Sequence, residues 1–361
     1  MFALTALVAT VQRGVLSRSH TTFPIFRQSF HHLVAGSDLY AAYPAEQGNR
    51  PQDRFKYSPT AALFFAPFAQ VPFAFGLLLW NLLNVTALLF ALERVLPPAP
   101  AAAAQLLVFP STLAAVQSSS SNALIAALIM LAFAAISDGR HKLGAALVAT
   151  GALIKIFPLA VLTAAWGRPN RLRFAVTVIG AFGVLVALPA AVSGPADLLR
   201  QYQSWWGMIS ADAHDLAFGY STMQLIRVLT RGDFPSWPIQ VIGTLLLLLP
   251  LGVRRDAMRD PPSRLQFLAF LMVYVVLFNH QAEFQSFVIA SAGMAVWFVS
   301  GRRTVVRAVV VACCLIGFTT VPFSIVWLMM LSDLVLPAPQ AVRRTIDPAT
   351  STATPRLDLV A

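Results

Sequence analysis

Charged residues are scarce in this chain. They make up 11% of its 361 residues, against about 25% in soluble domains. Hydrophobic residues reach 57%, and a soluble fold of this length could not bury that much apolar surface. Lipid must therefore be the solvent for much of the chain, which predicts an integral membrane protein.

Cysteine is nearly absent too. The two cysteines, Cys313 and Cys314, are adjacent within an apolar run, which excludes a disulfide framework and a cysteine metal site. The chain also lacks a glycine-rich phosphate loop, a nucleotide-binding fingerprint and a catalytic serine elbow. These absences argue against an activated donor bound by a soluble nucleotide fold. No cluster of residues calls for a metal ion or another cofactor.

Basic residues exceed acidic ones, with a net charge of +11 and a pI near 10.6. A nucleic-acid-binding protein would gather these charges on one face, and we expect no such partner. Here they stand in short clusters between apolar runs, as cytoplasmic loops do in membrane proteins. The clusters are 140–142, 168–173, 254–255, 302–307 and 343–344.

Apolar runs bounded by turn or charge signals predict an all-α polytopic protein with about 10–12 transmembrane segments. The segment 2–11 is too short to span a membrane, so the true start could lie upstream. We expect residues 1–336 to form one transmembrane catalytic domain and residues 337–361 a disordered cytoplasmic tail. The other runs are 61–92 (with a break at 67–72), 101–116, 123–136, 143–166, 174–192, 239–251, 265–278, 287–299, 305–318 and 321–336.

The run 143–166 decides the topology, because basic clusters flank it on both sides. Lys155 and Pro158 lie in its middle, and proline breaks a helix. A hairpin of two half-helices with Lys155 near its tip keeps both clusters in the cytoplasm. Segment 20–59 then becomes an external loop on the same face as His280 and segment 194–238, which the basic clusters further along the chain already place outside. The alternative, a straight span, puts residues 20–59 inside.

The first of these loops carries Asp38 and Lys56, which could serve as a base and a phosphate anchor. In the alternative, Tyr40, Tyr43 and Tyr57 form an interfacial aromatic belt and Asp38 is merely solvated.

Two further sites place ionisable groups among apolar residues. His280 and Glu283 stand in a turn between two spans, where such groups are costly and usually functional, although a lone histidine is often structural. Lys155 could meet a lipid phosphate or could snorkel to the cytoplasmic side.

Polar residues also mark two other external segments. The serine run 118–121 reads as a flexible connector, although Gln117 and Asn122 at its ends could hydrogen-bond a sugar. Residues 197–215 fit an amphipathic helix in the membrane interface, with Trp205 and Trp206 as anchors.

Five short motifs follow one another along the chain: Asp38-Leu39-Tyr40, Phe55-Lys56-Tyr57-Ser58-Pro59, Trp80-Asn81, Ile154-Lys155-Ile156-Phe157-Pro158 and Phe278-Asn279-His280-Gln281-Ala282-Glu283. In this order they resemble glycosyltransferase family 87, the bacterial polyprenol-phosphate-mannose-dependent α-mannosyltransferases of the GT-C class. The resemblance runs from about residue 22 to residue 299. The chain departs from the family at one turn, where Ser119 and Ser120 stand before Asn122 in place of a Gly-Gln pair.

This resemblance implies an inverting transferase of the bacterial inner membrane, with its active site on the extracytoplasmic side. The donor would be a polyprenyl-phosphate sugar and the acceptor a glycan or glycolipid. Asp38 matches the catalytic base of this class. Our candidates for the donor phosphate are Lys56, His280, Lys155 and Arg227. Those for the rest of the substrates are Tyr40, Tyr57, Gln117, Asn122, Gln281 and Glu283.

Two other functions remain open at this point. A transporter or flippase of a lipid-linked glycan would also use intramembrane Lys155 and His280. Such transporters often carry paired broken helices, and only one candidate occurs here. A non-catalytic membrane subunit that binds a partner is the third reading.

Overall fold

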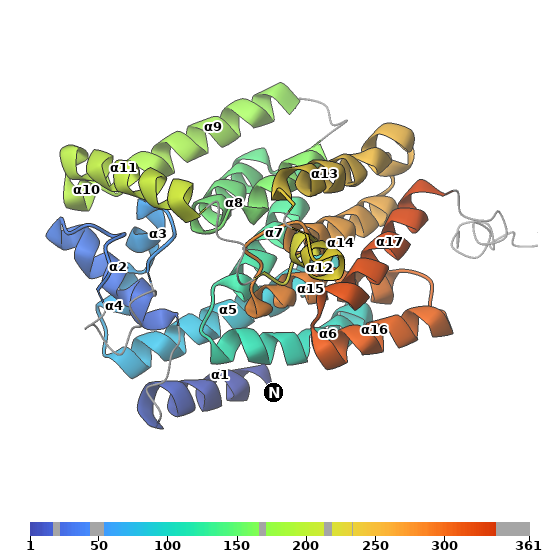
Figure 1. The fold of residues 1–361 in the computed structure, drawn as a ribbon, viewed down its shortest axis with the longest axis horizontal. Helices are drawn as coiled ribbons and strands as arrows, with labels where there is room; N and C mark the ends of the chain where they lie inside the picture. The colour runs from blue at the N-terminus through green and yellow to red at the C-terminus, as the bar shows by residue number, and fades with distance from the viewer. Residues whose placement is uncertain (17–21, 44–53, 166–170, 213–218, 233, 337–361) are drawn as a thin grey trace, which may run out of the picture.

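The computed structural model describes residues 1–16, 22–43, 54–165, 171–212, 219–232 and 234–336. Within these ranges the regular elements are helices and there is no strand, which confirms the all-α prediction (Figure 1). The tail predicted at 337–361 and the basic residue Arg168 lie outside the described residues.

The helices follow the apolar runs closely. They are α1 Phe2–Thr10, α2 Phe23–Ala35, α3 Pro59–Phe64, α4 Ala66–Ala69, α5 Phe73–Val95, α6 Pro98–Gln117, α7 Asn122–Ser137, α8 His141–Ile154, α9 Arg171–Ala187, α10 Ala190–Ser193, α11 Pro195–Asp212, α12 Thr222–Thr230, α13 Ser236–Val253, α14 Pro261–Leu277, α15 Phe287–Ser300, α16 Val305–Gly317 and α17 Thr320–Val335. Short π and 3₁₀ segments join some of them, including η2 Phe157–Ala165 and η4 Phe284–Ser286.

Four of these helical stretches are long and apolar enough to cross a bilayer: α5, α6, residues 171–193 and α13. Seven further apolar helices in the described residues have 10–17 residues, below the roughly 20 of an ideal span. The polytopic membrane character is thus confirmed, whereas the number of 10–12 segments stays a prediction.

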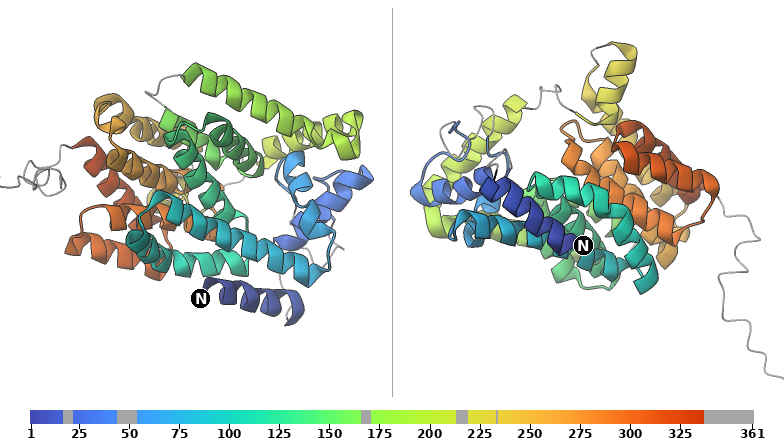
Figure 2. Two further views of the ribbon diagram at one scale, coloured as in Figure 1. Left: turned by 180° about the vertical axis from the view of Figure 1, so that it is seen from behind. Right: turned by 90° about the horizontal axis from the view of Figure 1, so that it is seen from below.

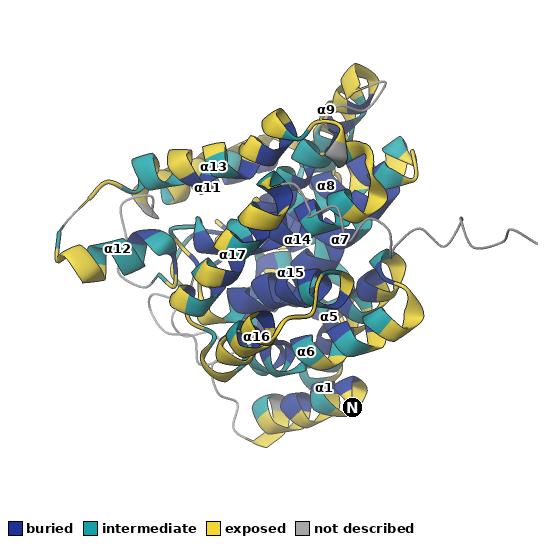
Figure 3. Ribbon diagram, turned by 90° about the vertical axis from the view of Figure 1, so that its right-hand side faces the viewer, coloured by how far each residue is buried: buried dark blue, intermediate teal, exposed yellow. Residues whose placement is uncertain are grey.

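The core of the bundle consists of α7, α14 and α15. Most residues of α7 and α15 are buried, as are those of the second half of α14 (Figure 3). Helices α5 and α6 pack around this core, and α1 covers them from outside (Figure 2). By contrast, only 11% of the apolar window in residues 171–193 is buried. A helix this apolar and this exposed needs lipid around it.

The predicted hairpin at 143–166 is confirmed. Helix α8 ends at Ile154, because Pro158 has no N–H to offer the carbonyl of that residue. Lys155 adopts an extended conformation, and the chain folds back as η2. The turn is tight: a Cβ on Gly151 would lie 2.7 Å from the Pro158 ring.

The start of α9 consequently returns to the start of α8. The rings of His141 and Phe174 lie 5.7 Å apart, so the basic residues at the starts of the two helices, Arg140 and Arg171 among them, share one end of the bundle. Ion pairs and hydrogen bonds join the other helices at this basic end: Arg94 with Asp138, Arg264 with Ser137, Gln266 with Ser300 and Arg254 with the carbonyl of Val335.

The segment 20–59, which we predicted as an external loop, contains a helix. Helix α2 occupies residues 23–35 and buries Phe23, Phe26 and Leu33 at helical spacing. The polar residues between them, Arg27 and His31 among others, obscured this pattern in the sequence. Residues 44–53 of the same segment lie outside the described part of the chain.

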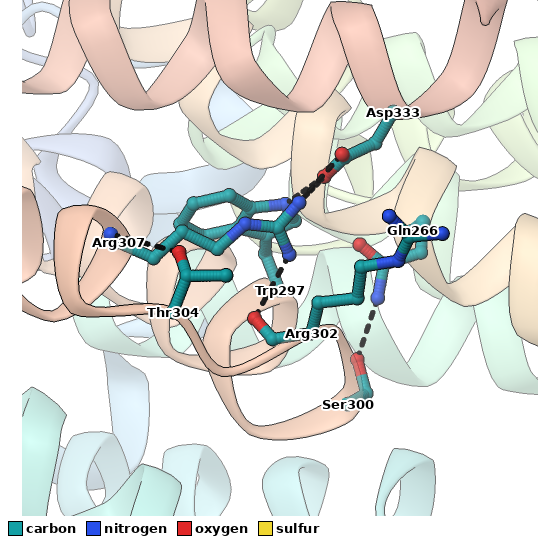
Figure 4. Close-up of polar contacts among 7 residues, drawn as sticks. All are labelled: Gln266, Trp297, Ser300, Arg302, Thr304, Arg307 and Asp333. Atoms are coloured by element: carbon teal, nitrogen blue, oxygen red, sulfur yellow. Dashed lines mark hydrogen bonds and ion pairs between the residues drawn. The ribbon is translucent and has the colours of Figure 1, made fainter. Parts of the chain in front are cut away.

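Arg307 lies near the start of α16, and its guanidinium packs against residues of α15 and α17 (Figure 4). Its guanidinium contacts both carboxylate oxygens of Asp333 on α17, at 2.5 and 2.6 Å, and donates to the carbonyl of Arg302. It also lies 4.6 Å from the ring of Trp297 on α15, whose N–H donates to Asp333. The Arg307 guanidinium thereby joins α15, α16 and α17 at the end of the bundle where we predict the cytoplasmic loops.

Replacing Arg307 should weaken this end of the protein. Arg307→Met leaves the Asp333 carboxylate without its cation, which costs about 3–5 kcal/mol in a fully buried pair. The Asp333 side chain is 33% exposed, so water offsets part of the loss and we expect about 2 kcal/mol. Thermal unfolding in detergent measures it. Arg303→Met, at an exposed neighbour, should leave the midpoint unchanged, and equal midpoints for both variants would contradict the prediction.

Candidate active site

Asp38 directly follows the end of α2. The helix ends at Gly36, whose φ of +66° is in the left-handed region, and a Cβ there would lie 2.9 Å from an Asp197 carboxylate oxygen. The Asp38 carboxylate then accepts from the backbone N–H of Tyr40 at 3.0 Å, which forms a local turn. Its side chain is exposed, so the carboxylate can reach a substrate while the N–H of Tyr40 holds one of its oxygens.

Helix α11 holds the backbone on both sides of Asp38. The buried Gln201 accepts from the N–H of Leu39 at 3.0 Å and donates to the carbonyl of Ser37 at 2.7 Å. One turn further, the Ser204 hydroxyl lies 2.9 and 3.0 Å from the two Asp38 oxygens. The candidate base is thus attached to a segment more than 160 positions away in the sequence.

Aromatic residues connect this turn to residues 55–58. The buried Tyr40 hydroxyl donates to the carbonyl of Tyr57 at 2.8 Å, and burial raises the pKa of Tyr40, so the phenol remains a protonated donor. The Trp205 N–H donates to the carbonyl of Lys56 at 3.1 Å. Tyr40 therefore holds the loop rather than merely lining the interface, and Trp205 does more than anchor α11 in lipid.

The tip of the hairpin reaches the same place. Its Lys155 amine donates to the Asn122 amide oxygen at 2.8 Å and lies 5.8 Å from the ring centre of Tyr57. The Ser58 hydroxyl donates to the carbonyl of Leu153, one of the groups left unpaired where α8 ends. The first loop thus provides a hydrogen-bond donor to the end of the broken helix. The broken helix in turn places the Lys155 ammonium beside Tyr57 in that loop.

The serine turn between α6 and α7 is a buried, ordered support and not a flexible connector. Ser119 has a φ of +53°, in the region that favours glycine. The carbonyl of Ser119 accepts from the Trp80 N–H and from the Thr22 hydroxyl. Asn122 is fully buried, which leaves it no surface for a sugar hydroxyl; Gln117 is half-buried at the end of α6. Asn122 instead holds Lys155.

Arg227 and His280 form a second cluster. Both line a small pocket between α12 and the 279–283 turn, together with Ser221, Met223, Gln224, Phe234 and Ser236. The His280 ring nitrogen lies 3.4 Å from the Gln240 amide, and the backbone of Ala282 accepts from Tyr220. Gln281 and Glu283 in the same turn are exposed. The structure thus brings Asp38, Tyr57 and Lys155 together in one group, and Arg227 and His280 in another.

A larger cavity of about 480 Å³ lies at the basic end of the bundle, far along the helices from both clusters. It lies between the ends of α5 and α7 and the starts of α6 and α14, and Arg94, Asp138 and Arg264 line it. Size alone would select this cavity as the active site. We select the opposite end, where Tyr40 and Tyr57 connect the turn of the exposed Asp38 carboxylate to the Lys155 ammonium.

Residues 55–279 match the family model described as glycosyltransferase family 87. The chain belongs to this family. The matched range covers more than half of the chain and includes Lys56, Lys155 and Arg227. Asp38 lies outside it, and His280 directly follows its last residue. A comparison with curated proteins found no match.

Membership in family 87 makes the protein a glycosyltransferase, in agreement with the resemblance that its motifs carry. The sequence did not point to Gln201 and Ser204. They stand at i and i+3 on an amphipathic helix, with Trp205 at i+4, a spacing that places all three on one face. That spacing identifies a contact face but not the segment that it contacts.

Removing the Gln201 amide should loosen the Asp38 turn. Gln201→Leu leaves the N–H of Leu39 and the carbonyl of Ser37 without partners, and we expect a cost of about 1–3 kcal/mol. Hydrogen–deuterium exchange across residues 36–43 should rise about tenfold or more, since 1.4 kcal/mol corresponds to a factor of ten. Gln203→Leu, on the exposed side of the same turn of α11, is the matched control. Unchanged exchange in Gln201→Leu would contradict the role of Gln201 in holding the Asp38 turn.

Proposed function

We propose that this glycosyltransferase moves a hexosyl group, mannosyl by its family resemblance, from a polyprenyl-phosphate sugar to a glycan or glycolipid acceptor. The observation that carries the proposal is the exposed Asp38 carboxylate, held by Ser204 and the N–H of Tyr40 in the cluster that contains Lys155. A base and a cation in one cluster suit a reaction that deprotonates an alcohol and releases a phosphate.

In this reaction Asp38 accepts the proton of the acceptor hydroxyl as its oxygen attacks the anomeric carbon. The bond between that carbon and the phosphate oxygen breaks on the opposite face, and the polyprenyl phosphate leaves with the electron pair. Configuration at the anomeric carbon inverts from β to α. The leaving group is an anion from the outset, so it needs no general acid; one carboxylate suffices.

Cations near the phosphate stabilise the charge that develops on it. Lys155 is the best supported candidate, because Asn122 and the rings of Tyr57 and Phe157 hold its amine at a fixed position. Lys56 is adjacent in sequence to Tyr57, and its side chain is exposed. Arg227 and His280 share their own pocket and are proposed to bind the same phosphate or the chain-proximal part of the donor.

The remaining candidates divide by exposure. Gln281 and Glu283 are exposed and are proposed to bind sugar hydroxyls, as is the half-buried Gln117. Tyr40 and Asn122 are buried and bonded within the protein, so we propose that they act by holding Tyr57 and Lys155. Tyr57, half-buried between Phe26 and Lys155, is proposed to line the site with its ring.

We propose that the Asp38 end faces the outside of the bacterial inner membrane. The charge distribution supports this orientation, because cytoplasmic loops carry an excess of lysine and arginine. Nearly every loop at the opposite end carries such residues, among them Arg94, Arg140, Arg171, Arg254 and Arg302. A transporter or flippase of a lipid-linked glycan remains the alternative, for which the intramembrane hairpin at Lys155 is the motivating feature.

Replacing the proposed base gives the first test. Asp38→Asn keeps the shape of the side chain but cannot accept the proton, and sugar transfer should fall by at least about 100-fold. Transfer is measured in membranes with a panel of polyprenyl-phosphate sugars, which also identifies the donor. Asp256→Asn, an exposed carboxylate at the basic end, is the control. Full transfer by Asp38→Asn would eliminate Asp38 as the base; binding of the lipid donor without transfer by the wild-type protein would favour the transporter.

Orientation is tested by cysteine labelling. In a chain whose Cys313 and Cys314 are replaced by alanine, Ala42→Cys should react with a membrane-impermeant maleimide in intact cells. Both Ala42 and Arg303 are exposed, at opposite ends of the bundle, so Arg303→Cys should react only after permeabilisation. The reverse pattern would place the Asp38 cluster in the cytoplasm.

A further inference from the structure

One face of α11 is bonded to the segment that carries the proposed base. Gln201 hydrogen-bonds the backbone next to Asp38, and Ser204 contacts the Asp38 carboxylate. The Trp205 N–H donates to the carbonyl of Lys56. The hydroxyl of Tyr202, on the next position, lies 3.2 Å from Thr60 at the start of α3. The other face of α11 exposes Leu199 and Trp206. The helix therefore has an inner face that contacts the first loop and an outer face that is exposed.

Ser204 stands out on the inner face because it touches the reactive group itself. Its hydroxyl lies nearly equidistant from the two oxygens of Asp38, while the N–H of Tyr40 approaches Oδ1. A carboxylate offers about four lone-pair directions, so two donors fix its rotation and still leave directions open towards solvent. An exposed aspartate without such donors would rotate among its rotamers.

We propose that Ser204 is a positioning residue for sugar transfer, which orients the Asp38 carboxylate towards the acceptor hydroxyl. This inference rests on the proposed function, in which Asp38 is the base. The hydroxyl does not touch the substrate or the breaking bond. It fixes the direction of the lone pair that receives the proton, and proton transfer is efficient only when the base stands within hydrogen-bond reach of the acceptor.

The test uses the full-length chain and three variants of α11. Ser204→Ala removes the hydroxyl and should lower kcat about tenfold, with KM within about twofold of the wild type, because the base is misdirected while the binding residues are intact. Ser204→Thr keeps a hydroxyl at the same position and should restore most of kcat. Ser210→Ala, an exposed serine on the same helix, should leave both constants unchanged and controls for general effects on α11.

A double-mutant cycle with Asp38→Asn separates this inference from the proposed function. If Ser204 acts through Asp38, Ser204→Ala should cause no further loss in the residual activity of Asp38→Asn. Losses that multiply would overturn the positioning role, as would wild-type kcat in Ser204→Ala or failure of threonine to rescue. In each of these cases sugar transfer by Asp38→Asn would still be at least about 100-fold below that of the wild type, and the proposed function would stand. Full transfer by Asp38→Asn would instead eliminate Asp38 as the base, and the positioning role with it.

Discussion

The interruption of the helix at Lys155 is the constraint on which the rest of this structure depends. Pro158 ends the helix and Gly151 lets the returning segment pack closely against it. The chain can then enter and leave at the same end, with α8 and α9 starting side by side. A broken helix within a membrane requires partners for its exposed carbonyls. Ser58 provides one of them, and this bond joins the first loop to the hairpin.

The two ends of the bundle hold their charges in different ways. At the basic end, Arg307 and Asp333 neutralise each other between three helices, and Arg94 pairs with Asp138. These charges contribute to packing and are already compensated. At the other end, the Asp38 carboxylate is held by neutral donors, a hydroxyl and a backbone N–H. Hydrogen bonds therefore orient this carboxylate, whereas ion pairs hold the charged groups at the basic end.

The site is assembled from segments that are remote in the chain, and each is supported by a buried polar residue. Asn122 holds the lysine, Gln201 holds the Asp38 turn, and the Ser119 carbonyl accepts from Trp80. Ser119 itself adopts a conformation that favours glycine, at the turn where the family resemblance expects a Gly-Gln pair. Ser119 therefore adopts at this turn a conformation that glycine would adopt at a lower conformational cost.

Much of the architecture was predictable from the sequence. Apolar runs bounded by charges predicted the helices, and two basic clusters around Lys155 and Pro158 predicted the hairpin, because lipid and the charge asymmetry of membranes act on local sequence. Helix α2 escaped prediction, since polar residues interrupt its buried stripe. Asp38 and Lys155 were also predicted as candidate site residues, and their roles stay predictions. Only the tertiary structure decided what holds them. Gln201 and Ser204 look like ordinary polar residues in the sequence, and Asn122 was predicted to bind a sugar rather than Lys155. A hydrogen bond between remote segments leaves no periodic signal in either one.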